Sequence, residues 1–223
     1  MNVCEAVATR RSIRAFLDAP VPLETVRHVL EQARMAPSGC NYQPWEATVL
    51  TGKPLQSLQQ ALLAGQPDDP QEYDFSVPGR YPKYKERFTR LGTAMYGALG
   101  IGRGDSETRL RFREKNLLSF GAPVLLLCHF PKFMGPPQWS DVGMWLQTIM
   151  LLVRGEGLDS CPQEWMGVYG RTIKTHLRLP DDTLLFCGLA IGRRDPDAPA
   201  NQFPRERVPL EEQVTFQGFD RAS

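Results

Sequence analysis

The chain has 223 residues, of which 42% are hydrophobic and 23% are charged, proportions typical of a globular protein with a substantial core. The formal net charge is only +1, which does not favour nucleic acid or an anionic membrane as a partner. The N-terminus lacks the basic flank and apolar stretch of a signal peptide, and the apolar run at residues 124–128 is too short to span a bilayer. We therefore expect a cytoplasmic protein that binds neither nucleic acid nor membrane.

The cysteines and histidines form no recognisable metal or disulfide pattern. Five cysteines are scattered without a C-x-x-C pair, and the three histidines have no neighbour at ligand spacing. Cys128 and Cys187 lie in apolar runs and are expected to be buried thiols. We predict no metal site and a reducing compartment.

Hydrophobic spacing in the first half of the chain predicts helices at residues 22–33, 53–64 and 84–99, and a strand at residues 45–50. A loop rich in proline and glycine, residues 65–82, is long for a compact domain, so it is either a lid or a simple excursion. The run Gly100-Ile101-Gly102-Arg103-Gly104 follows a helix rather than a strand. We therefore interpret it as a helix end and turn, not as a dinucleotide-binding loop.

In the second half, Asp105 is suited to cap a helix that reaches about Ser119. The continuous apolar run at residues 124–130 predicts a buried central strand. Residues 139–156 predict a long helix that is apolar on most faces, which indicates a subunit interface as well as a core.

The remaining pattern predicts a short strand at residues 158–161, a helix that ends near residue 176 and a strand at residues 184–191. Gly188 inside the last strand predicts a close approach to the backbone. Residues 195–223 carry four prolines and predict an extended arm. Helices and strands alternate, which indicates an α+β or α/β fold in a single domain of residues 1–223.

Two basic clusters lie near opposite ends of the chain. The first has three arginines around a serine and the second has two arginines: Arg10, Arg11, Ser12 and Arg14, and then Arg205 and Arg207. An isolated basic run is usually solvated, but cations that stay together in a folded protein usually meet an anion. If the two clusters meet in space, they form a phosphate site, because guanidinium groups offer paired donors and remain charged.

A second polar segment follows the first predicted helix. Asn41 and Gln43 lie in a loop with two prolines, and their amides offer both donors and acceptors. Such groups are suited to contact the edge of a heteroaromatic ring.

Four segments, in this order along nearly the whole chain, resemble the nitroreductase family of FMN-dependent flavoproteins. They are Arg10-Arg11-Ser12-Ile13-Arg14-Ala15-Phe16, Ala36-Pro37-Ser38-Gly39-Cys40-Asn41-Tyr42-Gln43-Pro44-Trp45, Gly157-Leu158-Asp159-Ser160-Cys161-Pro162-Gln163-Glu164 and Arg205-Glu206-Arg207-Val208-Pro209-Leu210. The resemblance implies an α+β nitroreductase-like fold with a mixed central sheet flanked by helices. It also implies a homodimer with FMN sites at the interface and a C-terminal arm, about residues 195–223, that wraps the partner subunit.

The resemblance further implies a role for each matched residue. Those that would hold the FMN phosphate are Arg10, Ser12, Arg205 and Arg207, with Arg11 near the ribityl chain. Arg14 would lie at the N1 and C2 carbonyl edge, where a fixed cation stabilises the charge of the reduced ring. The other subunit would supply Pro37, Ser38, Asn41 and Gln43. One face of the ring would meet Cys161, Pro162, Gln163 and Glu164. Asn116, with Arg113 or Lys115, would contact the pyrimidine edge or else belong to an exposed helix surface.

The activity implied by the resemblance is a ping-pong oxidoreductase. NADH or NADPH would deliver hydride to flavin N5, and a nitroaromatic, a quinone or another electron-poor acceptor would then take the same place. FMN carries this chemistry, so no catalytic residue is predicted. Aromatic residues that would line the acceptor side, or else belong to core or interface, are Tyr73, Phe75, Tyr81, Tyr84 and Trp165.

Two questions stay open at this point, the kind of activity and the choice of electron donor. A reductive dehalogenase or a flavin-fragmenting enzyme would use the same FMN frame, and a flavin-binding module without turnover is a third possibility. The choice between NADH and NADPH is open because no ribose-reading motif of the Rossmann kind is present.

Overall fold

The computed structural model describes residues 1–219, and residues 220–223 of the predicted arm lie outside the described residues. At its centre is a four-stranded sheet in the order β1-β2-β4-β3. The strands are β1 (Glu46–Thr51), β2 (Val124–Pro131), β3 (Asp159–Gln163) and β4 (Thr183–Gly192). The fold is α+β, as predicted.

The pairings between these strands are all antiparallel. Within residues 1–219, parallel pairing is confined to an isolated bridge between Ser12 and Ser160 at the open edge of β3. The sheet of residues 1–219 is therefore mixed, as predicted, only if this single parallel bridge is counted with its antiparallel pairings.

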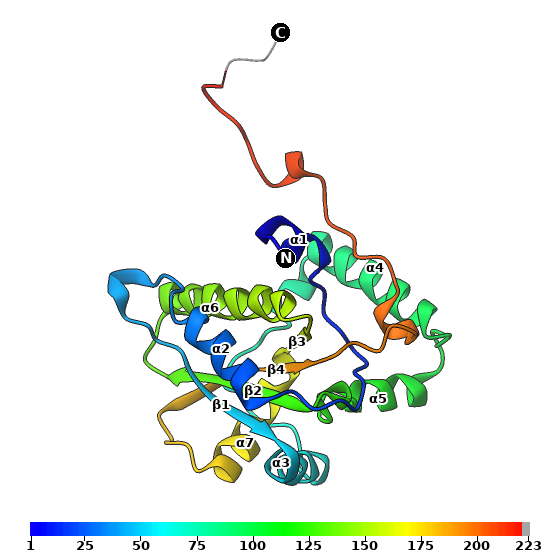
Figure 1. The fold of residues 1–223 in the computed structure, drawn as a ribbon. Helices are drawn as coiled ribbons and strands as arrows, with labels where there is room; N and C mark the ends of the chain where they lie inside the picture. The colour runs from blue at the N-terminus through cyan, green and yellow to red at the C-terminus, as the bar shows by residue number, and fades with distance from the viewer. Residues whose placement is uncertain (220–223) are drawn as a thin grey trace.

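Helices cover both faces of the sheet (Figure 1). One face carries α2 (Leu23–Ala33) and α6 (Pro136–Gly155), and the opposite face carries α3 (Gly52–Ala64) and α7 (Gly170–Leu177). Leu126 packs with the first pair of helices and Leu127 with the second. Successive side chains of a strand point to opposite faces, so a strand covered on both sides must be apolar at every position, as β2 is.

Two predicted helices differ from the structure at their ends. Helix α5 (Ser106–Glu114) begins at the predicted cap, because the Asp105 carboxylate accepts a hydrogen bond from the Thr108 N–H at 3.0 Å. It ends at Glu114, five residues before the predicted end, because the chain then tightens into turns in which the Asn116 N–H donates to the Arg113 carbonyl at 3.0 Å and the Leu117 N–H to the Glu114 carbonyl at 2.9 Å. Helix α6 begins three residues earlier than predicted, because prolines are tolerated in a first helical turn.

Helix α1 (Val3–Thr9) was not predicted from the sequence. The Asn2 side chain accepts from the Glu5 N–H at 2.9 Å, and the Glu5 carboxylate accepts from the Asn2 N–H at 3.0 Å. This reciprocal capping box is a sequence-readable start signal, with Asn at the cap and Glu three positions later.

The first part of the loop at residues 65–82 is tied to the body. The Asp68 N–H donates to the Val168 carbonyl at 2.7 Å, and the Asp68 carboxylate accepts from the Arg171 N–H at 2.8 Å. The Tyr73 hydroxyl donates to the Phe186 carbonyl, and its ring packs in the core. Of the aromatic residues considered for the acceptor side, Tyr73, Phe75 and Trp165 are partly buried and pack against the core, which is the alternative role considered for them.

As predicted, another group lies close to the backbone of Gly188, but that group is a core side chain and not a ligand. A Cβ atom at this position would lie 2.8 Å from Met166 Cγ and 3.2 Å from Leu125 Cδ1. A glycine inside β4 thus allows Met166 to pack directly against the strand.

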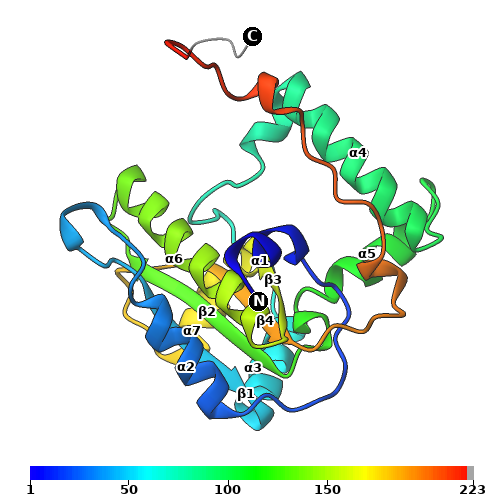
Figure 2. The ribbon, with the colours of Figure 1, turned by 45° about the horizontal axis from the view of Figure 1, so that its top comes forward.

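The arm leaves β4 and runs beside α4 (Pro82–Ala98) before it projects from the body (Figure 2). It is extended apart from short turns at Pro199–Asn201 and Leu210–Glu212. Two ion pairs join it to α4, Arg90 with Glu206 at 2.8 Å and Arg87 with Glu212 at 3.4 Å. Among residues 1–219, no helix has both the length and the hydrophobicity needed to cross a bilayer.

Candidate functional site

A cavity of about 490 Å³ opens where the two ends of the chain meet α4. Its lining includes all six residues of the predicted basic clusters: Arg10, Arg11, Ser12, Arg14, Arg205 and Arg207. Helix α4 adds Arg87 and Arg90. Arg10 and Arg205 are 195 positions apart in the sequence, so only the folded chain brings the clusters together.

Backbone contacts place the first cluster at the edge of the sheet. The Ile13 N–H donates to the Ser160 carbonyl at 3.0 Å, which aligns this segment with β3. The Arg14 N–H donates to Asn201 Oδ1 at 2.8 Å, and Asn201 Nδ2 donates to the Ala15 carbonyl at 2.9 Å. The buried Asn201 side chain thus ties the start of the arm to the N-terminal segment, a role that no local sequence pattern indicated.

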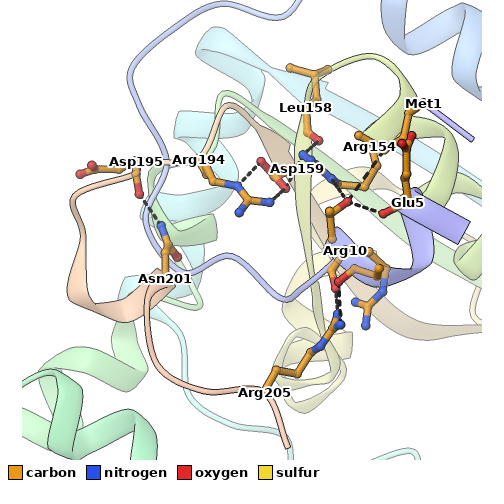
Figure 3. Close-up of polar contacts among 12 residues, drawn as sticks. Met1, Glu5, Arg10, Arg154, Leu158, Asp159, Arg194, Asp195, Asn201 and Arg205 are labelled. Carbon is orange, nitrogen blue, oxygen red and sulfur yellow. Dashed lines mark hydrogen bonds and ion pairs between the residues drawn. The ribbon is translucent and has the colours of Figure 1, made fainter.

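A buried ion triad fixes the same corner (Figure 3). The Asp159 carboxylate, with a side chain only 3% exposed, accepts from Arg154 Nη1 at 2.9 Å and from Arg194 Nε at 2.7 Å. Arg154 also donates to the Leu158 carbonyl at 2.9 Å. One carboxylate therefore joins the end of α6, the start of β3 and the exit from β4. Asp159 lies in one of the four matched segments, but no local sequence pattern indicates this role.

The cations of the cavity disfavour one another. Burial lowers the pKa of Arg10, and the nearby charges of Arg205 and Arg207 lower it further. Burial likewise lowers the pKa of Arg11, with added repulsion from Arg194, Arg205 and Arg14. Charges that repel in a partly dehydrated cavity are stabilised by a bound anion, so these residues fit a phosphate group.

The arginines differ in whether their guanidinium groups already form hydrogen bonds with other parts of the protein. The Arg205 guanidinium donates to the carbonyls of Ala8, at 2.8 Å, and of Arg10, so it caps the C-terminal end of α1. The Arg11 guanidinium donates to the Phe203 carbonyl and lies 5.5 Å from the centre of the Phe203 ring. Within residues 1–219, no hydrogen bond or ion pair engages the guanidinium of Arg10. Arg10 is thus the half-buried cation most available to an anion.

The residues predicted along one ring face divide into two sets, because side chains alternate along β3. Cys161 is 1% exposed, and burial raises the pKa of its thiol to about 11. Gln163 is also buried, and its Nε2 donates to the Asn116 carbonyl at 2.7 Å. Pro162 and Glu164 are more accessible, although loss of hydration still raises the pKa of the Glu164 carboxyl. Contacts of Cys161 and Gln163 with a bound ring would therefore be made by backbone atoms.

The three residues considered for the pyrimidine edge are placed differently. Asn116 lies next to β3 through its hydrogen bond with Gln163 and is half-buried rather than on an exposed helix surface. The Arg113 guanidinium lies 5.5 Å from the centre of the Trp165 ring and lines a separate cavity of about 220 Å³. Lys115 is exposed. The structure thus brings only Asn116 to the strand of the predicted ring face.

The loop with Pro37, Ser38, Asn41 and Gln43 does not line the arginine cavity of its own chain. It contains the turn Gly39–Asn41 and is held to α6 by the Gly39 N–H, which donates to Asp141 at 3.2 Å. The Gln43 N–H donates to Ser38 Oγ at 2.9 Å, and Gln43 Nε2 donates to the Asn41 carbonyl at 3.0 Å. These hydrogen bonds hold the loop against α6, outside the arginine cavity of the same chain.

Comparison with known proteins matches residues 7–193 to the model of the Nitroreductase family. A 4-nitrobenzoate reductase of Pseudomonas putida is 37% identical over 96% of this chain and 95% of its own length. A crystal structure of an FMN- and NADPH-dependent nitroreductase NfnB, from Sphigopyxis sp. strain HMH, is 45% identical with a TM-score of 0.93 and covers 98% of this chain and 100% of its own. Nitroreductase NfnB of Mycobacterium smegmatis in complex with NADPH is 29% identical with a TM-score of 0.90 and covers 97% of this chain and 100% of its own. The chain belongs to the nitroreductase family, as its four matched segments predicted.

Proposed function

We propose that this protein is an FMN-dependent oxidoreductase that uses NADPH or NADH to reduce nitroaromatic compounds, quinones or similar electron-poor acceptors. The observation that carries this proposal is the arginine cavity, in which two distant basic clusters converge on one space of about 490 Å³. FMN, when bound, supplies the chemistry of accepting and donating hydride. The relatives that combine this family with FMN, NADPH and nitroaromatic acceptors support the assignment.

In this proposal the protein binds and orients, and no side chain needs to transfer a proton. Arg10, Ser12 and Arg207 bind the phosphate, and Arg205 holds the backbone that presents Arg10. Arg14 is a fixed cation beside β3, suited to stabilise negative charge on a reduced ring. Its backbone N–H donates to Asn201, and its guanidinium donates to the Ser12 carbonyl at 3.4 Å, so both contacts exist before any ligand binds.

The first test is anaerobic titration of the purified protein with each nicotinamide donor. We expect a yellow protein whose flavin absorbance is bleached by NADPH or NADH and restored by a nitroarene, with the flavin recovered intact. Loss of flavin in proportion to turnover would indicate a flavin-fragmenting enzyme. Restoration by a haloaromatic compound but not by a nitroarene would indicate a dehalogenase. A yellow protein that neither donor bleaches would contradict the proposal and favour a flavin-binding module.

We further propose a homodimer whose FMN sites combine the arginine cavity of one subunit with the loop at residues 37–43 of the other. Helix α4 buries no residue within its own chain and exposes Phe88, 72% of whose surface is accessible. The arm exposes Phe216 and Phe219 where it projects from the body (Figure 1). Several large exposed apolar residues on one helix and on the arm that runs beside it are typical of a protein–protein interface.

We expect light scattering to give the mass of a dimer for the intact protein. Replacing Phe216 and Phe219 by serine should raise the dissociation constant of the dimer by about 10²-fold or more, because each buried phenylalanine contributes about 1.5–3 kcal/mol. The control is Leu63→Ser, an exposed leucine of α3 on the face of the sheet opposite to α6. A flavin-loaded monomer of the intact protein would contradict the shared site.

A cytoplasmic location also belongs to this proposal. It is supported by the need for a reduced nicotinamide donor and by the absence of disulfides among the five cysteines, all of which lie within the described residues.

A further inference from the structure

The arginine cavity holds more positive charge than one FMN phosphate needs. Its lining contains seven arginines and two glutamates, a formal charge of +5. A phosphate monoester at neutral pH carries a charge of about −2. About three positive charges therefore remain after the phosphate is bound.

Two of the surplus cations come from α4, outside all four matched segments. Arg87 and Arg90 are three positions apart, so they lie on the same side of the helix and both face the cavity. Arg87 is also oriented by the Tyr84 ring, whose centre lies 5.6 Å from the guanidinium carbon. The helix thus presents two guanidinium groups to one space, an arrangement that suits the several oxygens of a phosphate.

The present partners of Arg87 and Arg90 are weak and replaceable. Glu212 and Glu206 are 51% and 61% exposed, and they meet Arg87 and Arg90 at 3.4 Å and 2.8 Å. Exposed ion pairs stabilise a fold little, because water screens them and ordering the side chains has an entropic cost. A phosphate with more charge and more acceptor oxygens competes well with such carboxylates.

We propose that Arg87 and Arg90 form a second anion subsite, which binds a phosphate group of the nicotinamide donor. The inference rests on the proposed function, in which the donor and FMN occupy the same site. Two phosphate-bearing molecules close together repel, so the second requires cations of its own. The chain lacks a Rossmann ribose-reading motif, and this subsite supplies a different means of recognising the donor.

The phosphate in question is either the 2′-phosphate, found only in NADPH, or the pyrophosphate, which both donors share. Arg87→Gln combined with Arg90→Gln distinguishes them in the FMN-loaded protein. Loss of the 2′-phosphate contact should raise KM for NADPH about tenfold or more and leave KM for NADH within about twofold. Loss of a pyrophosphate contact should raise both KM values alike.

Direct binding provides a readout independent of turnover. Calorimetric titration with 2′,5′-ADP, compared with 5′-AMP, should show tighter binding of the doubly phosphorylated probe, and the double variant should lose that difference or weaken both probes. Arg80→Gln is the matched control, an exposed arginine paired with Asp74 at 2.7 Å that does not line the cavity. Glu206→Gln with Glu212→Gln should tighten binding of the probe, since it removes the competing carboxylates. If the pairs served only to hold the arm, this change would leave probe affinity unaltered or weaken it.

Unchanged KM values and probe affinities in the arginine double variant, with its FMN content and thermal midpoint retained, would overturn the inference. Loss of FMN from that variant would also overturn it, because the arginines would then serve the flavin phosphate. Failure of the proposed function looks different. A wild-type protein without FMN, or without oxidation of either donor, would refute the oxidoreductase. Comparison of the 2′,5′-ADP titrations of that protein and of its Arg87→Gln, Arg90→Gln variant would still decide whether the subsite exists.

Discussion

Arg10→Ala combined with Arg207→Ala should yield a colourless protein that retains its fold. Each arginine is expected to make charge-assisted hydrogen bonds with the FMN phosphate, and such bonds contribute about 1.5–3 kcal/mol apiece. Loss of both should weaken FMN binding by about 10²–10⁴-fold. The measurement is flavin absorbance of the purified protein, followed by titration with FMN monitored by quenching of flavin fluorescence.

Arg10 and Arg207 test phosphate binding more cleanly than Arg205. Arg205 donates to the carbonyls of Ala8 and Arg10, so its truncation would also remove a cap from α1. The control is Arg27→Ala, an exposed arginine of α2 that does not line the cavity. Stoichiometric flavin in the double variant would show that the cavity does not hold the phosphate.

Asp159→Asn should lower the free energy of unfolding by about 3–5 kcal/mol, the typical effect of removing one partner from a buried ion pair. The neutral amide keeps the size of the side chain but leaves Arg154, whose side chain is only 13% exposed, without its counter-charge. Arg194 is 31% exposed and can recover part of its hydration, which favours the lower end of this range. Urea denaturation of the FMN-free protein measures the change without a contribution from ligand binding.

The matched control is Asp74→Asn, which breaks an exposed pair with Arg80 and should change stability by about 0.2–1 kcal/mol. A similarly small effect for Asp159→Asn would mean that the ion triad does not stabilise the fold. Because Asp159 lies next to Ser160, which pairs with the Arg10–Arg14 segment, the variant should also bind FMN more weakly. If the variant kept its stability but lost FMN, Asp159 would serve only to position the Arg10–Arg14 segment.

Much of the fold was predictable because the local spacing of apolar residues indicates helices and strands. The spacing of apolar residues indicated α2, α3, β2 and β4 to within a few residues, since burial on one face or on both leaves a periodic trace. Errors occurred at helix ends, where tight turns after Glu114 shorten α5 and first-turn prolines extend α6. A capping box, readable in the sequence but not used, marks the start of α1.

By itself, the sequence determined the chemistry available to this protein: two arginine clusters, an amide-bearing loop and the order of four segments that identify the family. Only the tertiary structure decided that the clusters meet, that Arg205 caps a helix, and that Gln163 points inward to Asn116. It alone revealed that Asn201 and Asp159 connect segments distant in the sequence, and that two arginines of α4 line the same cavity. The reason is physical, because residue types set which interactions a chain can make, while contacts between residues nearly two hundred positions apart depend on how the sheet and its helices pack.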